Sequence, residues 1–167
     1  MALELMIEAI VYALLYGAFI SLLMTKQGAA MQLYNYPPKI QEQAITLGIT
    51  TKEEMAANAK RYKPLGFAVM TILCLIIICG INRETSFAAG LFQSYIFLNA
   101  FSVFDAAVID SVWFCHSKFW IIPGTEDMTE AYHDYLFHWK WVLVGLVSLL
   151  PIAAVIGGLT ALIGIIL

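Results

Sequence analysis

The residue types that most often do chemistry in proteins are concentrated in one stretch of this chain. Between residues 99 and 141 lie all three histidines, all four tryptophans and half of the twelve acidic residues. Two of these acids, Asp105 and Asp110, fall inside an apolar run long enough to cross a bilayer. A carboxylate there costs roughly 2.5–3.5 kcal/mol on insertion scales, so it usually pairs, titrates or lines a polar cavity. We therefore expect a functional site around the two aspartates.

Other polar side chains of the same stretch extend this candidate site. We place them on an α-helix at about 100° per residue. The projection gives two lines about 120° apart, with Ser102 between them: Asn99, Asp110 and Ser117 on one line, and Ser94, Asp105 and His116 on the other. We expect Asn99, Ser102, Asp105 and Asp110 to bind a solute or an ion on this polar face.

A structural role for the two aspartates is the alternative. Each could form an interhelical hydrogen bond with a Ser, Thr, Tyr or Asn side chain, or pair with Lys118 reaching inward. Asp105 and His116 are separated by about 16 Å along one α-helix, because each residue adds 1.5 Å of rise. Any coupling between them therefore needs water or other side chains.

A second group of candidates follows a Pro-Gly turn signal at residues 123 and 124. The acidic segment after it predicts one helix that runs on into the last apolar segment. On that helix, Glu130, Asp134 and His138 recur at every fourth position. Glu130 and His133 have the E-x-x-H spacing of carboxylate-bridged metal sites. The chain has no second E-x-x-H, so a di-metal site would lack half of its ligands.

A mononuclear metal site, or an acid and base pair, is easier to assemble from these residues. Imidazole nitrogens and carboxylate oxygens suit zinc or non-haem iron. The candidate ligands are His116, His133 and His138, with Glu130, Asp134 or Asp110. The alternative is a solvated helix face on which the acids form local ion pairs with Lys140 or Lys118.

Composition determines the broad class of the protein. Hydrophobic residues make up 61% of the 167, charged residues only 13%, and the mean hydropathy is +0.81. A soluble domain carries about 25% charged residues, so the sequence indicates an integral membrane protein. The net charge of −3 is small, and we expect no nucleic-acid partner. The three cysteines have no metal-ligand spacing.

Four runs are long enough to span a bilayer, which needs about 20 predominantly apolar residues. The sequence predicts an all-α, polytopic four-helix bundle in one membrane domain, residues 1–167. The predicted spans cover about 5–24, 64–81, 86–115 and 139–167, separated by loops at about 25–63 and 116–138. Only residues 82–85 connect the second and third spans. Because this connection is so short, the two spans must form an antiparallel hairpin.

Prolines and small residues add detail to these spans. Pro64 is expected in the first turn of the second span, and Pro151 is expected to kink the fourth. Small residues with four-residue spacing would let another helix approach closely, so we expect a homo-oligomer through such faces. They are Ala9, Ala13, Gly17 and Ser21 in the first span, and Ala153, Gly157 and Ala161 in the fourth.

Basic residues predict the orientation. Six of the nine lie in the first long loop, which the positive-inside tendency places in the cytoplasm. Four spans then put both termini outside and the second long loop inside as well, and we expect the cell membrane. Thr51 and Glu54 have capping-box spacing, which predicts a short helix over 52–63. Such interfacial helices would contact anionic lipid.

Three functions fit these observations. The first is a small membrane protein that binds or moves a solute or ion at an intramembrane carboxylate site. The second is a membrane enzyme acting on a lipid-like substrate at the cytoplasmic interface, with a His and carboxylate site that could hold a metal. The third is an accessory subunit whose polar residues hold helices together. Nucleotide-binding and α/β-hydrolase motifs are absent from the sequence.

Overall fold

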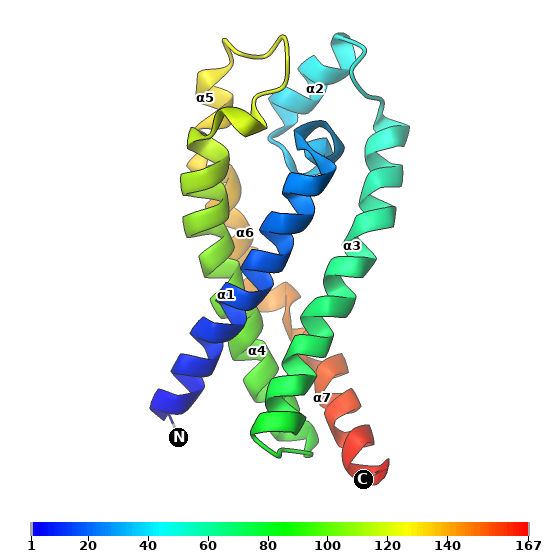
Figure 1. Cartoon of the computed structure of the whole chain (residues 1–167), viewed down its shortest axis with the longest axis vertical. Coiled ribbons are helices and arrows are strands. Elements are labelled where there is room, and N and C mark those ends of the chain that lie inside the picture. The colour runs from blue at the N-terminus through cyan, green and yellow to red at the C-terminus, as the bar shows by residue number, and fades with distance from the viewer. Residues whose placement is uncertain (1, 167) are drawn as a thin grey trace.

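The described residues, 2–166, form helices joined by short connections and contain no strand (Figure 1). This is a computed structural model. The long helices are α1 (Ala2–Gln27), α3 (Lys52–Leu75), α4 (Phe87–Phe104), α6 (Tyr135–Ser148) and α7 (Leu150–Ile166). Two of them continue as π-helices, α3 into η2 (Ile76–Ile81) and α4 into η3 (Asp105–Phe114). The shorter elements are η1 (Ala29–Asn35), α2 (Pro38–Thr46), η4 (Lys118–Trp120) and α5 (Thr129–Tyr132).

Three helical stretches are long and apolar enough to cross a membrane: Leu3–Gln27, Lys52–Ile81 and Phe87–Phe114. A fourth candidate is a pair of helices, Thr129–Ser148 and Leu150–Ile166, bent by 47°. The bend lies where Pro151 was expected to kink the last span, and proline explains it because it cannot donate a backbone hydrogen bond. The protein is thus all-helical over residues 2–166, with three or four candidate spans.

The second candidate span begins earlier than the sequence predicted. A single helix runs from Lys52 to Leu75 with Pro64 inside it, so the expected separate helix over 52–63 and the first-turn position of Pro64 are wrong. The capping box is confirmed: Thr51 Oγ1 accepts from the Glu54 amide at 3.1 Å, and Glu54 Oε2 accepts from the Thr51 amide at 3.0 Å. This cap starts the helix, and the fold tolerates the one backbone hydrogen bond that Pro64 removes.

Helix α4 lies at the centre of the fold, against α1 on one side and α7 on the other (Figure 1). Its contact with α7 is close: a Cβ added to Gly157 would lie 2.9 Å from the Phe87 carbonyl oxygen. On the other side, a Cβ added to Gly17 of α1 would lie 2.4 Å from the Phe104 ring. Small-residue faces expected to join two subunits therefore pack within one chain, which leaves the expected oligomer without support from these faces.

The chain ends and the loops are separated along the bundle. Both termini and the α3–α4 connection lie at one end, and both long connections lie at the other (Figure 1). The α3–α4 connection is the tight hairpin that the sequence predicted. Only a few residues separate the end of η2 at Ile81 from the start of α4 at Phe87, whose N-cap is Ser86. Asn82 fixes it by donating to Glu8 Oε2 at 2.9 Å and to Gln93 Oε1 at 2.8 Å.

The two long connections pack against each other and form a cap on that end of the bundle. The Tyr36 hydroxyl donates to the Trp120 carbonyl at 2.9 Å, which links residues 84 positions apart. The Tyr132 hydroxyl accepts from the Ile122 amide at 2.9 Å and lies 2.7 Å from Thr125 Oγ1. These side chains are buried, so the loops have an apolar core of their own.

Candidate functional site

A cavity of about 530 Å³ lies at the capped end of the bundle and is bounded by the first long loop and by residues of the neighbouring helices. Four helical elements supply part of its polar lining: Lys63 on α3, Ser102 on α4, Asp105 and Asp110 on η3, and His138 on α6. Three of the four residues predicted to bind a solute or ion are therefore brought together. The fourth, Asn99, is not in this lining and donates instead to the Tyr95 carbonyl of its own helix at 2.8 Å.

The π-helical backbone brings the two aspartates to one cavity. An α-helical projection predicted that Asp105 and Asp110 lie on two separate lines of the helix. This prediction is wrong, because the backbone hydrogen bonds of η3 join residues five positions apart. The Cys115 amide, for example, donates to the Asp110 carbonyl. Residues five apart then lie on nearly the same side of the helix. Most π-helices are single turns, and they occur frequently at functional sites. η3 covers ten residues and is therefore longer than usual.

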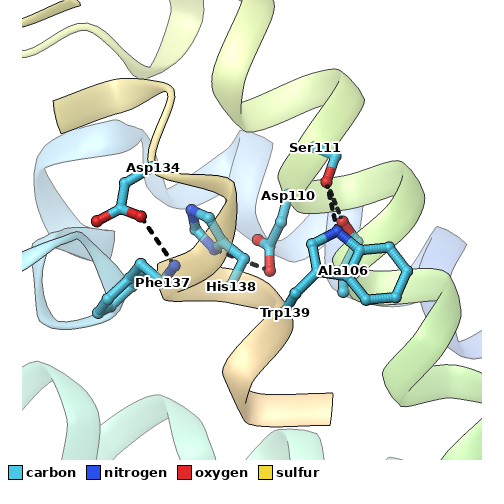
Figure 2. Close-up of polar contacts among 7 residues, drawn as sticks. All are labelled: Ala106, Asp110, Ser111, Asp134, Phe137, His138 and Trp139. Carbon is cyan, nitrogen blue, oxygen red and sulfur yellow. Dashed lines mark hydrogen bonds and ion pairs between the residues drawn. The ribbon is translucent and has the colours of Figure 1, made fainter. Parts of the chain in front are cut away.

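Asp110 pairs with the buried side chain of His138 (Figure 2). His138 Nδ1 lies 3.0 Å from Asp110 Oδ2, and His138 is 5% exposed. An ionised carboxylate only accepts hydrogen bonds, so Nδ1 is the donor. The second ring nitrogen, Nε2, is buried without a hydrogen-bond partner among the described residues. The pair joins the end of the third candidate span to the start of α6.

A second contact between these two segments fixes the same region. The Ser111 hydroxyl donates to the Ala106 carbonyl at 2.6 Å, five residues earlier, and accepts from Trp139 Nε1 at 3.2 Å (Figure 2). Ser111 therefore satisfies a carbonyl of the π-helix and ties it to α6. Since Asp110 and His138 are the neighbours of Ser111 and Trp139, two adjacent links hold the aspartate side of the cavity.

Asp105 is half-buried in the cavity lining, and no described residue forms a hydrogen bond or ion pair with its carboxylate. It lines the same cavity as Asp110. The proposed partner Lys118 does not reach them, because it is exposed in η4. The lysine at the cavity is Lys63, whose Nζ lies 5.5 Å from the centre of the Tyr34 ring.

The other two histidines form a separate, exposed group. His116 Nε2 lies 3.0 Å from the Tyr135 hydroxyl, and the His116 and His133 rings are 5.2 Å apart. Neither histidine lines the cavity that contains the aspartates. The structure thus separates His138, which faces the aspartates, from His116 and His133, which lie at the surface of the cap.

The continuous helix expected over 125–138 is wrong. α5 ends at Tyr132, α6 begins at Tyr135, and Asp134 caps α6 by accepting from the Phe137 amide at 3.0 Å (Figure 2). Glu130, Asp134 and His138 therefore do not share one helical face, and both acids are exposed. Within residues 2–166, no three His, Cys, Asp or Glu side chains gather closely enough to hold a metal ion.

Sequence reasoning missed the first long loop as a source of cavity residues. Tyr34, Asn35 and Tyr36 line the cavity, as does Lys63 after them in the chain. Burial raises the pKa of Tyr34 and of Tyr36 above the usual value of tyrosine, so both are neutral phenols at physiological pH. The aromatic and polar residues directly before Pro37 could have indicated that this segment packs against the rest of the protein. Pro37 and Pro38 were interpreted only as a turn.

Comparison with protein-family models, curated proteins and solved structures finds no match for this chain. The fold alone therefore defines the class: an all-helical protein over its described residues, with several helices apolar enough for a membrane location. The site adds a cavity with two carboxylates and one buried imidazole.

Proposed function

We propose that this chain is a four-span integral membrane protein that binds or moves a small solute or ion in the cavity that contains Asp105 and Asp110. One observation carries the proposal: both carboxylates of the third candidate span line the same cavity. Carboxylates within a membrane segment are costly and are kept where they serve a pathway, a proton relay or a ligand. A cavity of about 530 Å³ lies within the range of small-molecule sites.

The cell membrane and a cytoplasmic cap are part of this proposal. Six of the nine basic residues lie in the first long connection and the adjoining parts of α1 and α3, and this connection lies at the same end as the second loop (Figure 1). Positive charge favours the cytoplasmic side, where it contacts anionic lipid. The cavity would then face the cytoplasm, and both termini would lie outside.

Movement of a solute beyond the cavity requires a change of conformation. Between the cavity and the terminal end, the bundle is filled by an apolar core that includes Tyr12, Ile78 and Phe97, each fully buried. Over the described residues, this apolar core fills the bundle between its two ends. Binding is therefore the first step that an experiment can isolate, and transport would need α1, α3 and α4 to separate.

The experiment is a binding screen with the full chain in lipid nanodiscs. A panel of small cationic, anionic and neutral solutes is added, and the thermal unfolding midpoint is measured. A ligand at about 100 times its Kd stabilises the native state by about 2.7 kcal/mol. We expect Asp105→Asn and Asp110→Asn to abolish this stabilisation and Glu130→Gln, an exposed acid outside the cavity, to retain it. A ligand effect that is equal in all four proteins would refute the proposal.

The His138 and Asp110 pair is the observation that favours an enzyme as the second candidate. Such a pair orients an imidazole for proton transfer. However, the free nitrogen, Nε2, is buried, and a general base must reach the proton it removes. A lipid-like substrate consumed by the wild-type protein and left intact by His138→Gln would establish the enzyme.

A further inference from the structure

The helical wall of the cavity carries two carboxyl groups and only one side chain that pairs with them. Asp110 has His138 as a partner, whereas no described residue pairs with Asp105. Lys63 is exposed, and its ammonium lies near the Tyr34 ring and forms no ion pair with either aspartate. A carboxylate withdrawn from water is costly without a partner. The wall is therefore suited to a positively charged ligand.

His138 gives Asp110 one partner. Its Nδ1 lies 3.0 Å from Asp110 Oδ2, while its second ring nitrogen, Nε2, is buried without a partner among the described residues. Asp110 therefore has one side-chain partner in the cavity wall, and Asp105 has none.

Aromatic rings form much of the remaining wall of the cavity. They belong to Tyr34, Tyr36, Phe137 and Trp141. Two of them already bind a cation at the surface, because Lys140 Nζ lies 4.5 Å from the centre of Phe137 and 5.5 Å from that of Trp141. Aromatic faces next to a carboxylate are the usual recognition chemistry for substituted ammonium groups.

The geometry favours an organic cation over a metal ion. Zinc and non-haem iron take several protein ligands, and no group of three His, Cys, Asp or Glu residues within 2–166 could supply them. An alkylammonium group needs one carboxylate and apolar or aromatic walls. The cavity volume of about 530 Å³ also exceeds what a bare ion would fill.

We propose that the ligand of this cavity is a small alkylammonium cation whose charged head binds Asp105 and whose alkyl groups contact the rings of Tyr34 and Trp141. The inference rests on the proposed function and names its ligand class. The ammonium group has two sources, a free solute or the headgroup of a lipid, and both would bind through the same contacts.

The experiment compares choline with 3,3-dimethylbutan-1-ol, a neutral molecule of nearly the same shape. Binding is measured by calorimetry with the full chain in nanodiscs of phosphatidylglycerol, which has no ammonium group. We expect choline to bind at least about tenfold more tightly than the neutral isostere, since only choline can pair with Asp105. Asp105→Asn should remove this preference, Asp105→Glu should retain it, and Glu130→Gln should have no effect.

A second set of nanodiscs identifies the source of the cation. In phosphatidylcholine nanodiscs, a lipid headgroup that occupies the cavity would compete with free choline and weaken its apparent affinity. An unchanged affinity would identify a free solute. Size-exclusion profiles and unfolding midpoints check that the Asp105 variants are folded. If Asp105→Asn does not fold, Asp105→Glu still tests the role of this position.

Three results would overturn the inference. The first is equal binding of choline and its neutral isostere, and the second is choline binding that Asp105→Asn does not change. The third is an absence of choline binding by folded wild-type protein. If a neutral or anionic solute in the wider panel still depends on Asp105 and Asp110, the ligand class is wrong and the proposed function stands.

Discussion

The imidazole of His138 lies 3.0 Å from the carboxylate of Asp110 and joins α6 to the π-helical end of the third candidate span. The two residues are far apart in sequence and come from opposite sides of the second loop. Their contact holds one wall of the cavity in place, with the Ser111 and Trp139 hydrogen bond beside it. Changes at these positions should therefore affect stability and ligand binding together.

The first prediction concerns this pair. His138→Leu should lower the free energy of unfolding by about 1–3 kcal/mol, because it leaves the partly buried carboxylate of Asp110 without its donor. Adding Asp110→Leu should recover much of this loss, since two apolar side chains leave no polar group unpaired. Unfolding midpoints of the four proteins of this double-mutant cycle measure the coupling. If the two losses simply add, the pair contributes no coupling energy.

The second prediction concerns the contact of α4 with α7. Gly157→Ala should destabilise the fold by about 1–3 kcal/mol, because the overpacked contact must open. The new Cβ would lie 2.9 Å from the Phe87 carbonyl oxygen and 3.0 Å from the Leu91 amide nitrogen, and neither is a flexible side chain. Gly158→Ala is the matched control, since no atom lies within 4 Å of its added Cβ. Equal unfolding midpoints for the two variants would contradict this packing.

The third prediction concerns the cap formed by the two loops. Tyr36→Phe removes the hydroxyl that donates to the Trp120 carbonyl in a buried site. We expect a loss of about 1 kcal/mol and faster amide hydrogen exchange in η4. Tyr62→Phe is the control, because no described residue makes a hydrogen bond with the Tyr62 hydroxyl. Unchanged exchange in η4 after Tyr36→Phe would show that this bond does not hold the loops together.

The fourth prediction is a local pH dependence in the second loop. The amide of Gly124 donates to Glu126 Oε2 at 2.9 Å and lowers the pKa of that carboxyl. Because the folded pKa lies below the unfolded pKa, the stabilising contribution is present above the unfolded value. It is lost as the pH falls through the lowered folded value. A carbon-detected NMR titration of Glu126 measures this pKa, and Glu126→Gln should make the Gly124 amide shift independent of pH over this range.

Local signals in the sequence were sufficient to predict part of the fold. The capping box at Thr51 and Glu54 depends on residues three apart, and the tight connection after Ile81 follows from its length alone. The helix start expected at Pro64 failed because proline is tolerated inside a helix when strong helix signals begin well before it. The pattern of apolar residues predicts the four candidate spans, and it does not distinguish one bent span from two helices.

The site was predicted only in part, because two of its determinants are not local. Asp105 and Asp110 stood out as charges in an apolar run, but their relative direction depends on a π-helix that periodicity at 3.6 residues per turn does not detect. The E-x-x-H spacing suggested a ligand set with His133, whereas the chain breaks between α5 and α6 and only His138 reaches an aspartate. Lys63 comes from α3, and Tyr34 comes from η1 in the first long connection.

The five-residue hydrogen bonding of η3 also determines which genetic change would separate the two carboxylates. A substitution between Asp105 and Asp110 leaves their spacing unchanged. Insertion of a single residue there would place the two acids six positions apart, which is about 240° around an α-helix and therefore on different sides of it. The alignment of the two acids is thus a property of chain length in this segment, which makes it sensitive to an insertion and tolerant of most point mutations.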